Sequence, residues 1–144
     1  MKRGSRRSPL LWMGNQMAVL ETSFLIDVLR NKDDAKKVLG ELSQNNETLF
    51  IAAPSVTELW EGALWSIRAE KEKILVNQLL AALHVLPLDE KSAKKAASIK
   101  FELRDATIGY ADILIAAIAI EKSQMLVTRD GHYSKIAGLK ALKY

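Results

Sequence analysis

Four carboxylates occupy unusual places in this sequence. Most of its 17 acidic residues lie beside Lys or Arg in segments that look solvated, but four stand at the edges of apolar segments: Glu21, Glu58, Asp112 and Asp130. Like charges that share a partly buried site cannot all stay ionised, so either their pKa values rise or a cation neutralises them. These four residues are therefore the candidate functional groups.

A hard divalent cation is the simplest partner for such a group. The sequence has no cysteine and only two histidines, so the ligands that zinc favours are scarce, whereas carboxylate oxygens suit Mg²⁺ or Mn²⁺. We interpret both histidines, His84 and His132, as structural residues, because neither has an evident partner. The absence of cysteine also excludes a disulfide framework and a thiolate nucleophile. Mg²⁺ (or Mn²⁺) is the expected cofactor.

The elements that would position these residues follow a regular pattern from residue 17 onwards. Short apolar runs alternate with longer segments of helical period, which is typical of strands and helices in a parallel sheet. The expected strands are 18–21, 49–53, 84–86, 125–128 and 140–143. The expected helices begin at 22 or 23, after 34, at 54 or 55, at 69, at 90 and at 110, with a short one near 134–137. The sequence thus predicts an α/β fold, a three-layer α/β/α domain with a central, mostly parallel five-stranded sheet.

Parallel sheets bind ligands outside the carboxyl ends of their strands. Glu21 and Asp130 are expected at the ends of the first and fourth strands, and the helices that carry Glu58 and Asp112 begin at the same edge. One pocket can therefore gather all four carboxylates. Each also has an ordinary alternative, because Glu58 or Asp112 can be a helix cap or dipole partner, and Asp130, before Gly131, can be a turn residue.

The net charge of +4 belongs to the N-terminal segment. Residues 1–16 contain four basic residues and no acid, so the rest of the 144-residue chain holds 17 basic and 17 acidic residues. We interpret 1–16 as a basic N-terminal extension, disordered or not native, and 17–144 as one domain. No apolar run reaches the length of a membrane span, so we expect a soluble, cytoplasmic protein that does not bind membranes.

The neutral domain gives little direct evidence for RNA binding. A phosphate backbone would need basic residues that cluster in the fold. The candidates are Lys94, Lys95, Lys100, Arg104 and Arg129. An α/β phosphatase or phosphoryl-transfer enzyme is an alternative class, but the sequence lacks a glycine-rich phosphate loop after the first strand.

Four segments carry a resemblance to a known family. They are LETSFLIDVL at 20–29, SVTELWEGA at 55–63, ADILIAAIAI at 111–120 and LVTRDGHYSKIAGLKALKY at 126–144. In their order and spacing, residues 17–144 resemble the PIN-domain proteins, most closely the VapC-like toxin ribonucleases of type II toxin–antitoxin systems.

The resemblance implies a Mg²⁺- or Mn²⁺-dependent endoribonuclease, the toxin of a VapBC-like pair. The family's acidic positions fall on Glu21, Glu58, Asp112 and Asp130, and the metal ligands on Glu21, Asp112 and Asp130. Ser23 and Thr128 occupy positions that orient the site. A bound metal would hold the scissile phosphate and activate a water for in-line attack, and a second metal can arrive with the substrate. The implied partners are RNA, a VapB-like antitoxin and a second copy in a homodimer.

One position departs from the family pattern. The family nearly always has Asp at the first acidic position, where this chain has Glu21. The extra methylene moves the carboxylate by up to ~1.5 Å, and a misplacement of ~1 Å can cost about 10²-fold in rate. The alternative is therefore a catalytically impaired PIN module that binds RNA or a protein partner. Asp27 is too far along the helix to substitute, and we interpret it as a surface or capping residue.

Overall fold

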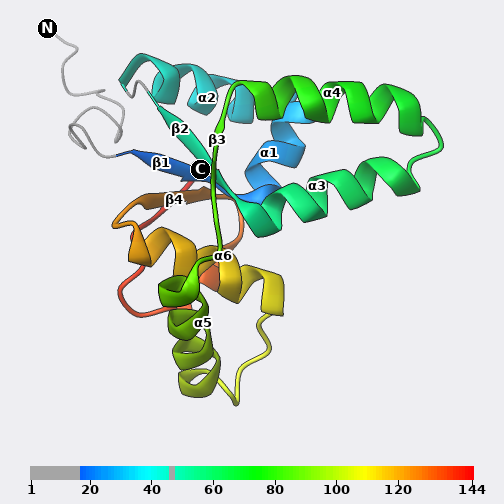
Figure 1. Cartoon of the computed structure of the whole chain (residues 1–144). Coiled ribbons are helices and arrows are strands. Elements are labelled where there is room, and N and C mark those ends of the chain that lie inside the picture. The colour runs from blue at the N-terminus through cyan, green and yellow to red at the C-terminus, as the bar shows by residue number, and fades with distance from the viewer. Residues whose placement is uncertain (1–16, 46–47) are drawn as a thin grey trace, which may run out of the picture.

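The computed structural model describes residues 17–45 and 48–144, so the predicted extension 1–16 lies outside the described residues. The sheet has five strands in the order β3-β2-β1-β4-β5, and all four neighbouring pairs are parallel. The strands are β1 (Ala18–Leu20), β2 (Leu49–Ala52), β3 (His84–Leu86), β4 (Met125–Thr128) and β5 (Ala141–Lys143). The predicted parallel sheet is therefore confirmed, with β1 and β4 side by side at its centre (Figure 1).

Helices cover both faces of the sheet. One layer contains α1 (Thr22–Leu29), α2 (Asp33–Asn45), α3 (Ala53–Trp65) and α4 (Ala69–Ala81), and the other contains α5 (Glu90–Glu102), α6 (Tyr110–Glu121) and the 3₁₀ helix η3 (Gly131–Lys135). Successive residues of a strand point to opposite faces of the sheet, and each face has its own hydrophobic core. Leu20 packs in the core under α1–α4, whereas Val19 packs in the core under α5 and α6. The structure thus confirms the three-layer α/β/α architecture.

The apolar segment of α6 is buried as expected. Its residues 115–119 are all buried, together with Ile113. Figure 1 shows α6 beside α5 on one side of the sheet, while α3 and α4 form an arm that extends away from the sheet on the other side. No helix in the described part of the chain is both long and apolar enough to cross a lipid bilayer.

Two helix starts differ from the prediction. We expected Thr22 or Ser23 to cap α1, but Glu21 is the N-cap and its side chain accepts a hydrogen bond from the Ser23 N–H. The short helix expected near 134–137 is η3, which begins at Gly131 because the Asp130 side chain caps it. In both cases a candidate site carboxylate provides the cap, since a carboxylate accepts the unpaired N–H groups of a first turn.

The buried face of α5 also differs from the prediction. The i, i+3, i+4, i+8 spacing of Ala93, Ala96, Ala97 and Phe101 predicts that these four residues form the buried face, but only Ala96 of these is buried, and Phe101 is 68% exposed. The helix instead buries the row Ser92, Ala96 and Ile99, of which Ala96 and Ile99 pack in the core with α6.

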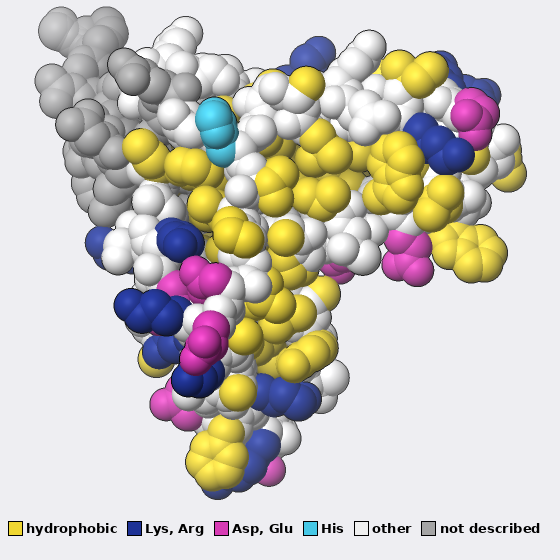
Figure 2. Space-filling view, in the orientation of Figure 1, with side chains coloured by type: hydrophobic (Ala, Val, Ile, Leu, Met, Phe, Trp, Pro, Cys, Tyr) yellow, Lys and Arg dark blue, Asp and Glu magenta, His cyan; other side chains and the backbone are white. Residues whose placement is uncertain are grey.

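From the sequence we interpret the three tryptophans, Trp12, Trp60 and Trp65, as packing residues. Trp60 packs against the core, but Trp65 at the end of α3 is 83% exposed, and Trp12 lies outside the described residues. Other large apolar side chains on or beside the same arm are exposed too, namely Leu64, Ile67 and Ile74. Figure 2 shows hydrophobic side chains gathered on the surface of this arm.

The central strands bring the first and fourth site segments together. In the register of β1 and β4, Leu20 lies opposite Val127. One residue further, the Glu21 N–H donates to the Val127 carbonyl oxygen at 2.9 Å, so the ladder continues beyond β1. Glu21 is thereby held beside Thr128, the last residue of β4.

Candidate functional site

Glu21 lies at the centre of the candidate site. Its side chain is only 4% exposed, and its carboxylate accepts hydrogen bonds from the Ser23 N–H, the Ser23 hydroxyl and the Thr128 hydroxyl. The pKa of Glu21 is raised overall. Burial is the largest cause and raises the pKa, the hydrogen bonds from Ser23 and Thr128 lower it, and the negative charge of Asp112 raises it further. Ser23 and Thr128 therefore hold the Glu21 carboxylate through hydrogen bonds.

Asp112 lies in the first turn of α6 and is held by Tyr133 of η3. The Tyr133 hydroxyl donates to Asp112 Oδ1 at 3.0 Å, and the tyrosine is 2% exposed. Burial raises the pKa of Asp112, the Tyr133 hydrogen bond lowers it, and the charge of Asp130 raises it, with a raised pKa as the result. Tyr133 is a site residue that the sequence analysis did not identify.

Asp130 is bound to its own loop. Its Oδ1 accepts a hydrogen bond from the His132 N–H at 2.9 Å and lies 2.8 Å from His132 Nδ1, while its own N–H donates to Thr128 Oγ1 at 2.9 Å. Burial raises the pKa of Asp130, but the hydrogen bonds from His132 and the charges of His132 and Lys143 outweigh this effect, so the pKa is lowered. The expectation that His132 has no partner was wrong.

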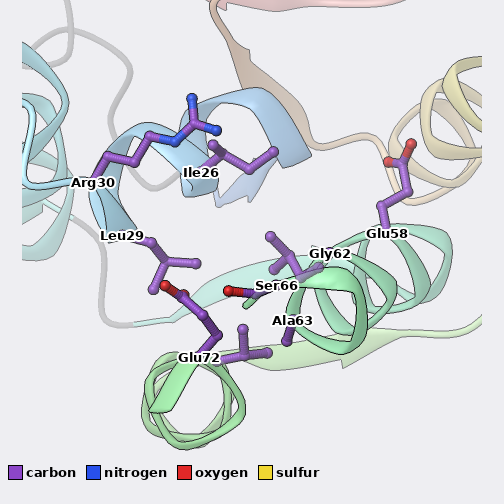
Figure 3. A pocket seen from close by; sticks show the side chains of 10 residues that line it. Ile26, Leu29, Arg30, Glu58, Gly62, Ala63, Ser66 and Glu72 are labelled. Atoms are coloured by element: carbon purple, nitrogen blue, oxygen red, sulfur yellow. The ribbon is translucent and has the colours of Figure 1, made fainter. Parts of the chain in front are cut away.

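Glu58 joins α3 to the start of α1. The Thr22 hydroxyl donates to Glu58 Oε1 at 2.6 Å, and Thr22 Oγ1 also lies 2.8 Å from Ser55 Oγ. Glu58 stands at the edge of a pocket of about 310 Å³ between α1, α3 and α4. In Figure 3 its carboxylate points away from the other labelled side chains of that pocket.

The four predicted carboxylates lie near one another at the carboxyl edge of the sheet. Burial raises the pKa of Tyr133, and so do the negative charges of Glu21, Asp112 and Glu58, of which Asp112 contacts the hydroxyl directly. Asp130 acts on Asp112 in the same way. However, no group of three or more His, Asp or Glu side chains among residues 17–45 and 48–144 is already arranged to hold a metal ion.

The residues fit a divalent cation by their chemistry. Glu21 and Asp112 are acids whose pKa values are raised, and each oxygen ligand they offer suits Mg²⁺ or Mn²⁺. Glu21 and Asp130 are bound by donors of the chain itself, so these carboxylates would have to exchange or share those hydrogen bonds with a metal.

The structure also shows a second cluster of polar side chains near this edge of the sheet, which the sequence analysis did not identify. Asp27, expected at the surface or as a cap, is 2% exposed and forms an ion pair with Arg129 and a hydrogen bond with the Tyr144 hydroxyl. One feature of the sequence indicates that Asp27 is buried. It lies three residues after Phe24, and residues with this spacing share one face of a helix, which here is the buried face of α1.

Four of the five basic residues proposed for phosphate binding have other partners. Arg129 is paired with Asp27, and Lys94 is paired with Glu90 at 2.8 Å. Lys100 lies over the Tyr110 ring, and Arg104 lies over Phe101.

The chain is similar to known proteins in both sequence and structure. The PIN domain family model matches residues 18–139. The VapC ribonuclease Y4jK of Sinorhizobium fredii is 30% identical over 131 residues, which cover 85% of this chain and 94% of that protein.

Among solved structures, VapBC2 from Rickettsia felis bound to a promoter DNA fragment has a TM-score of 0.82 and 24% identity, with 89% of this chain and 98% of that chain covered. FitAcB from Neisseria gonorrhoeae has a TM-score of 0.75 and 26% identity, with 88% and 97% covered. The chain therefore belongs to the PIN domain family and is similar to its VapC ribonucleases.

Proposed function

We propose that this chain is a metal-dependent endoribonuclease, the toxin of a VapBC-like toxin–antitoxin pair. The observation that carries the proposal is that the buried carboxylate of Glu21 and the partly buried carboxylate of Asp112, both at the carboxyl edge of the sheet, interact electrostatically and each have a raised pKa. Neighbouring carboxylates repel each other when they are ionised, and a bound cation offsets this repulsion. The family membership supports RNA as the substrate, because the matched relative is a VapC ribonuclease.

In this proposal Glu21, Asp112 and Asp130 hold Mg²⁺ or Mn²⁺ through carboxylate oxygens. A bound ion of this type supplies Lewis-acid chemistry to a phosphate and lowers the pKa of a water. Ser23 and Thr128 keep the Glu21 carboxylate in place through their hydroxyls. Glu58, held by Thr22 at Oε1, is the fourth catalytic residue and accepts a hydrogen bond from the attacking water. The catalytic unit lies within residues 17–144.

The exposed apolar side chains of the α3–α4 arm support the proposal that a protein partner binds there. Trp65 and Ile67, at the end of the α3–α4 arm, are almost fully exposed, and apolar surface of this extent is typical of interaction sites. The pocket that adjoins Glu58 is lined in part by Ile26, Leu29 and Val76. We propose that a VapB-like antitoxin covers this surface in the cytoplasm, and that the toxin is a homodimer. The structural neighbours include VapBC2 of Rickettsia felis and FitAB, each bound to a DNA fragment.

A catalytically impaired module that binds RNA or a protein is the second candidate. It is favoured by one observation: the Glu21 carboxylate, where the family has Asp, accepts three hydrogen bonds from the chain itself. Such a module would bind Mn²⁺ weakly and cleave RNA at a negligible rate.

The test is cleavage of a fluorophore-labelled single-stranded RNA by the purified chain with Mn²⁺ or Mg²⁺. Asp112→Asn removes one metal ligand and should lower the rate by about 10²-fold or more. Asp105→Asn makes the same chemical change at an exposed acid near α6 and should leave the rate unchanged. EDTA should abolish cleavage.

The rate differences decide between the two candidates. Cleavage that depends on both metal and Asp112 supports the ribonuclease. If the wild type cleaves no faster than Asp112→Asn, while both bind the RNA equally well, the impaired module is the better description.

A further inference from the structure

Tyr133 places one hydroxyl group among the site carboxylates. Its ring is 2% exposed and packs in the core under α5 and α6, so the position of the hydroxyl is determined by the core. The hydroxyl donates to Asp112 Oδ1 at 3.0 Å. Among the described residues Asp112 Oδ2 has no hydrogen-bond donor, and it lies beside Gly109.

We propose that Tyr133 is a positioning residue that orients the Asp112 carboxylate for metal binding. Because Oδ1 accepts the Tyr133 hydroxyl, the carboxylate plane has a defined direction and Oδ2 is left for the cation. Without this donor the carboxylate would rotate more freely about χ2, a torsion with broad wells. The inference rests on the proposed function, because it concerns the metal ligand of that same site.

The short helix η3 gives Tyr133 a second connection to the site. Asp130 caps η3 through the His132 N–H, and Tyr133 is the next residue in the same helix. The 3₁₀ helix η3 therefore positions both the proposed metal ligand Asp130 and the Tyr133 hydroxyl that donates to Asp112. The relative position of these two ligands, which come from different elements, depends on how Tyr133 is anchored in the core.

Outer hydrogen-bond partners of metal ligands commonly change metal affinity or activity by about 10–100-fold when they are removed. Tyr133→Phe removes only the hydroxyl and keeps the ring that packs in the core. We expect Mn²⁺ affinity, measured by isothermal titration calorimetry on the full chain, to fall by about 10-fold or more. The kcat for RNA cleavage should fall as well, while KM stays close to that of the wild type, because Tyr133 acts on Asp112 and not on the RNA.

Tyr110→Phe is the matched control. Tyr110 is the first residue of α6, two residues from Asp112, but its ring is 59% exposed and lies under Lys100. Removal of its hydroxyl should leave Mn²⁺ affinity and kcat unchanged. Circular dichroism and thermal unfolding without metal should show that both variants are folded.

Two results would overturn the inference, and they differ from a failure of the proposed function. If the wild type binds Mn²⁺ and cleaves RNA, but Tyr133→Phe does both equally well and only its melting temperature falls, Tyr133 has a purely structural role. If Tyr110→Phe loses as much affinity as Tyr133→Phe, the effect is not specific to the Asp112 contact. If the wild type itself neither binds Mn²⁺ nor cleaves RNA, the proposed function fails, and this inference fails with it.

Discussion

The guanidinium of Arg129 contacts both carboxylate oxygens of Asp27, at 2.9 Å from Oδ1 and 3.0 Å from Oδ2. Asp27 is buried in α1, and the Tyr144 hydroxyl donates to its Oδ2. Arg129 stands in the chain between Thr128 and Asp130. The pair therefore fastens the loop that carries two site residues to the helix that begins after Glu21.

Replacement of Arg129 should destabilise the fold. Among the described residues, Arg129→Ala leaves the buried Asp27 charge with the Tyr144 hydroxyl as its one remaining side-chain partner, and loss of one partner of a buried ion pair is costly. Because Arg129 is half exposed, we expect a loss of about 2 kcal/mol in the free energy of unfolding, measured with urea. Lys94→Ala, which breaks an exposed pair with Glu90, should cost less than about 0.5 kcal/mol. Equal losses in the two variants would contradict this account.

Shortening of Glu21 should not increase activity. In the natural chain the Thr128 hydroxyl donates a hydrogen bond to Glu21 Oε1. In Glu21→Asp the shorter side chain moves the carboxylate away from this hydroxyl. We expect the free energy of unfolding to fall by about 1 kcal/mol for the weakened hydrogen bond, and the RNA cleavage rate to stay level or decline. A rise of 10-fold or more in cleavage would instead show that Glu21 impairs the natural chain.

The cap of α5 should make stability depend on pH in the acid range. Hydrogen bonds from the Ser92 N–H and hydroxyl lower the pKa of Asp89 from 3.8 to about 2, with a further contribution from Lys122. The charged form is therefore favoured in the folded state, and its stabilisation is present above pH 3.8 and is lost as the pH falls through about 2. Asp89→Asn should be less stable than wild type at pH 7, and urea unfolding should show the difference shrinking between about pH 4 and pH 2. A difference that stays constant over this range would show that the charge of Asp89 is not responsible.

Metal binding should be visible without RNA. A ligand that binds only the folded state stabilises it by about 2.7 kcal/mol at 100 times its Kd, which corresponds to a rise in Tm of roughly 5–10 °C for a chain of this size. Differential scanning fluorimetry with Mn²⁺ should show such a rise for the wild type and a much smaller one for Asp112→Asn. No shift in the wild type at millimolar Mn²⁺ would argue against the proposed metal centre.

Local patterns were sufficient to predict most of the secondary structure. The α5 cap at Asp89, the buried α6 and the positions of β3 and β4 follow from signals within a few residues, such as a capping side chain or an apolar run. The sequence also predicts that Glu21, Glu58 and Asp112 lie at one edge of the sheet, because the ends of parallel strands and the starts of the next helices share that edge, and in the structure the charges of all three act on Tyr133.

Contacts between distant residues were decided only by the tertiary structure. Asp27 and Arg129 are 102 residues apart, and they meet because β1 and β4 are neighbours in the sheet. Tyr133 finds Asp112 because η3 packs against α6 in the same core. Periodicity and capping describe each element alone, whereas the rotation of a helix and the partner of a buried polar group depend on which surfaces the whole fold brings together.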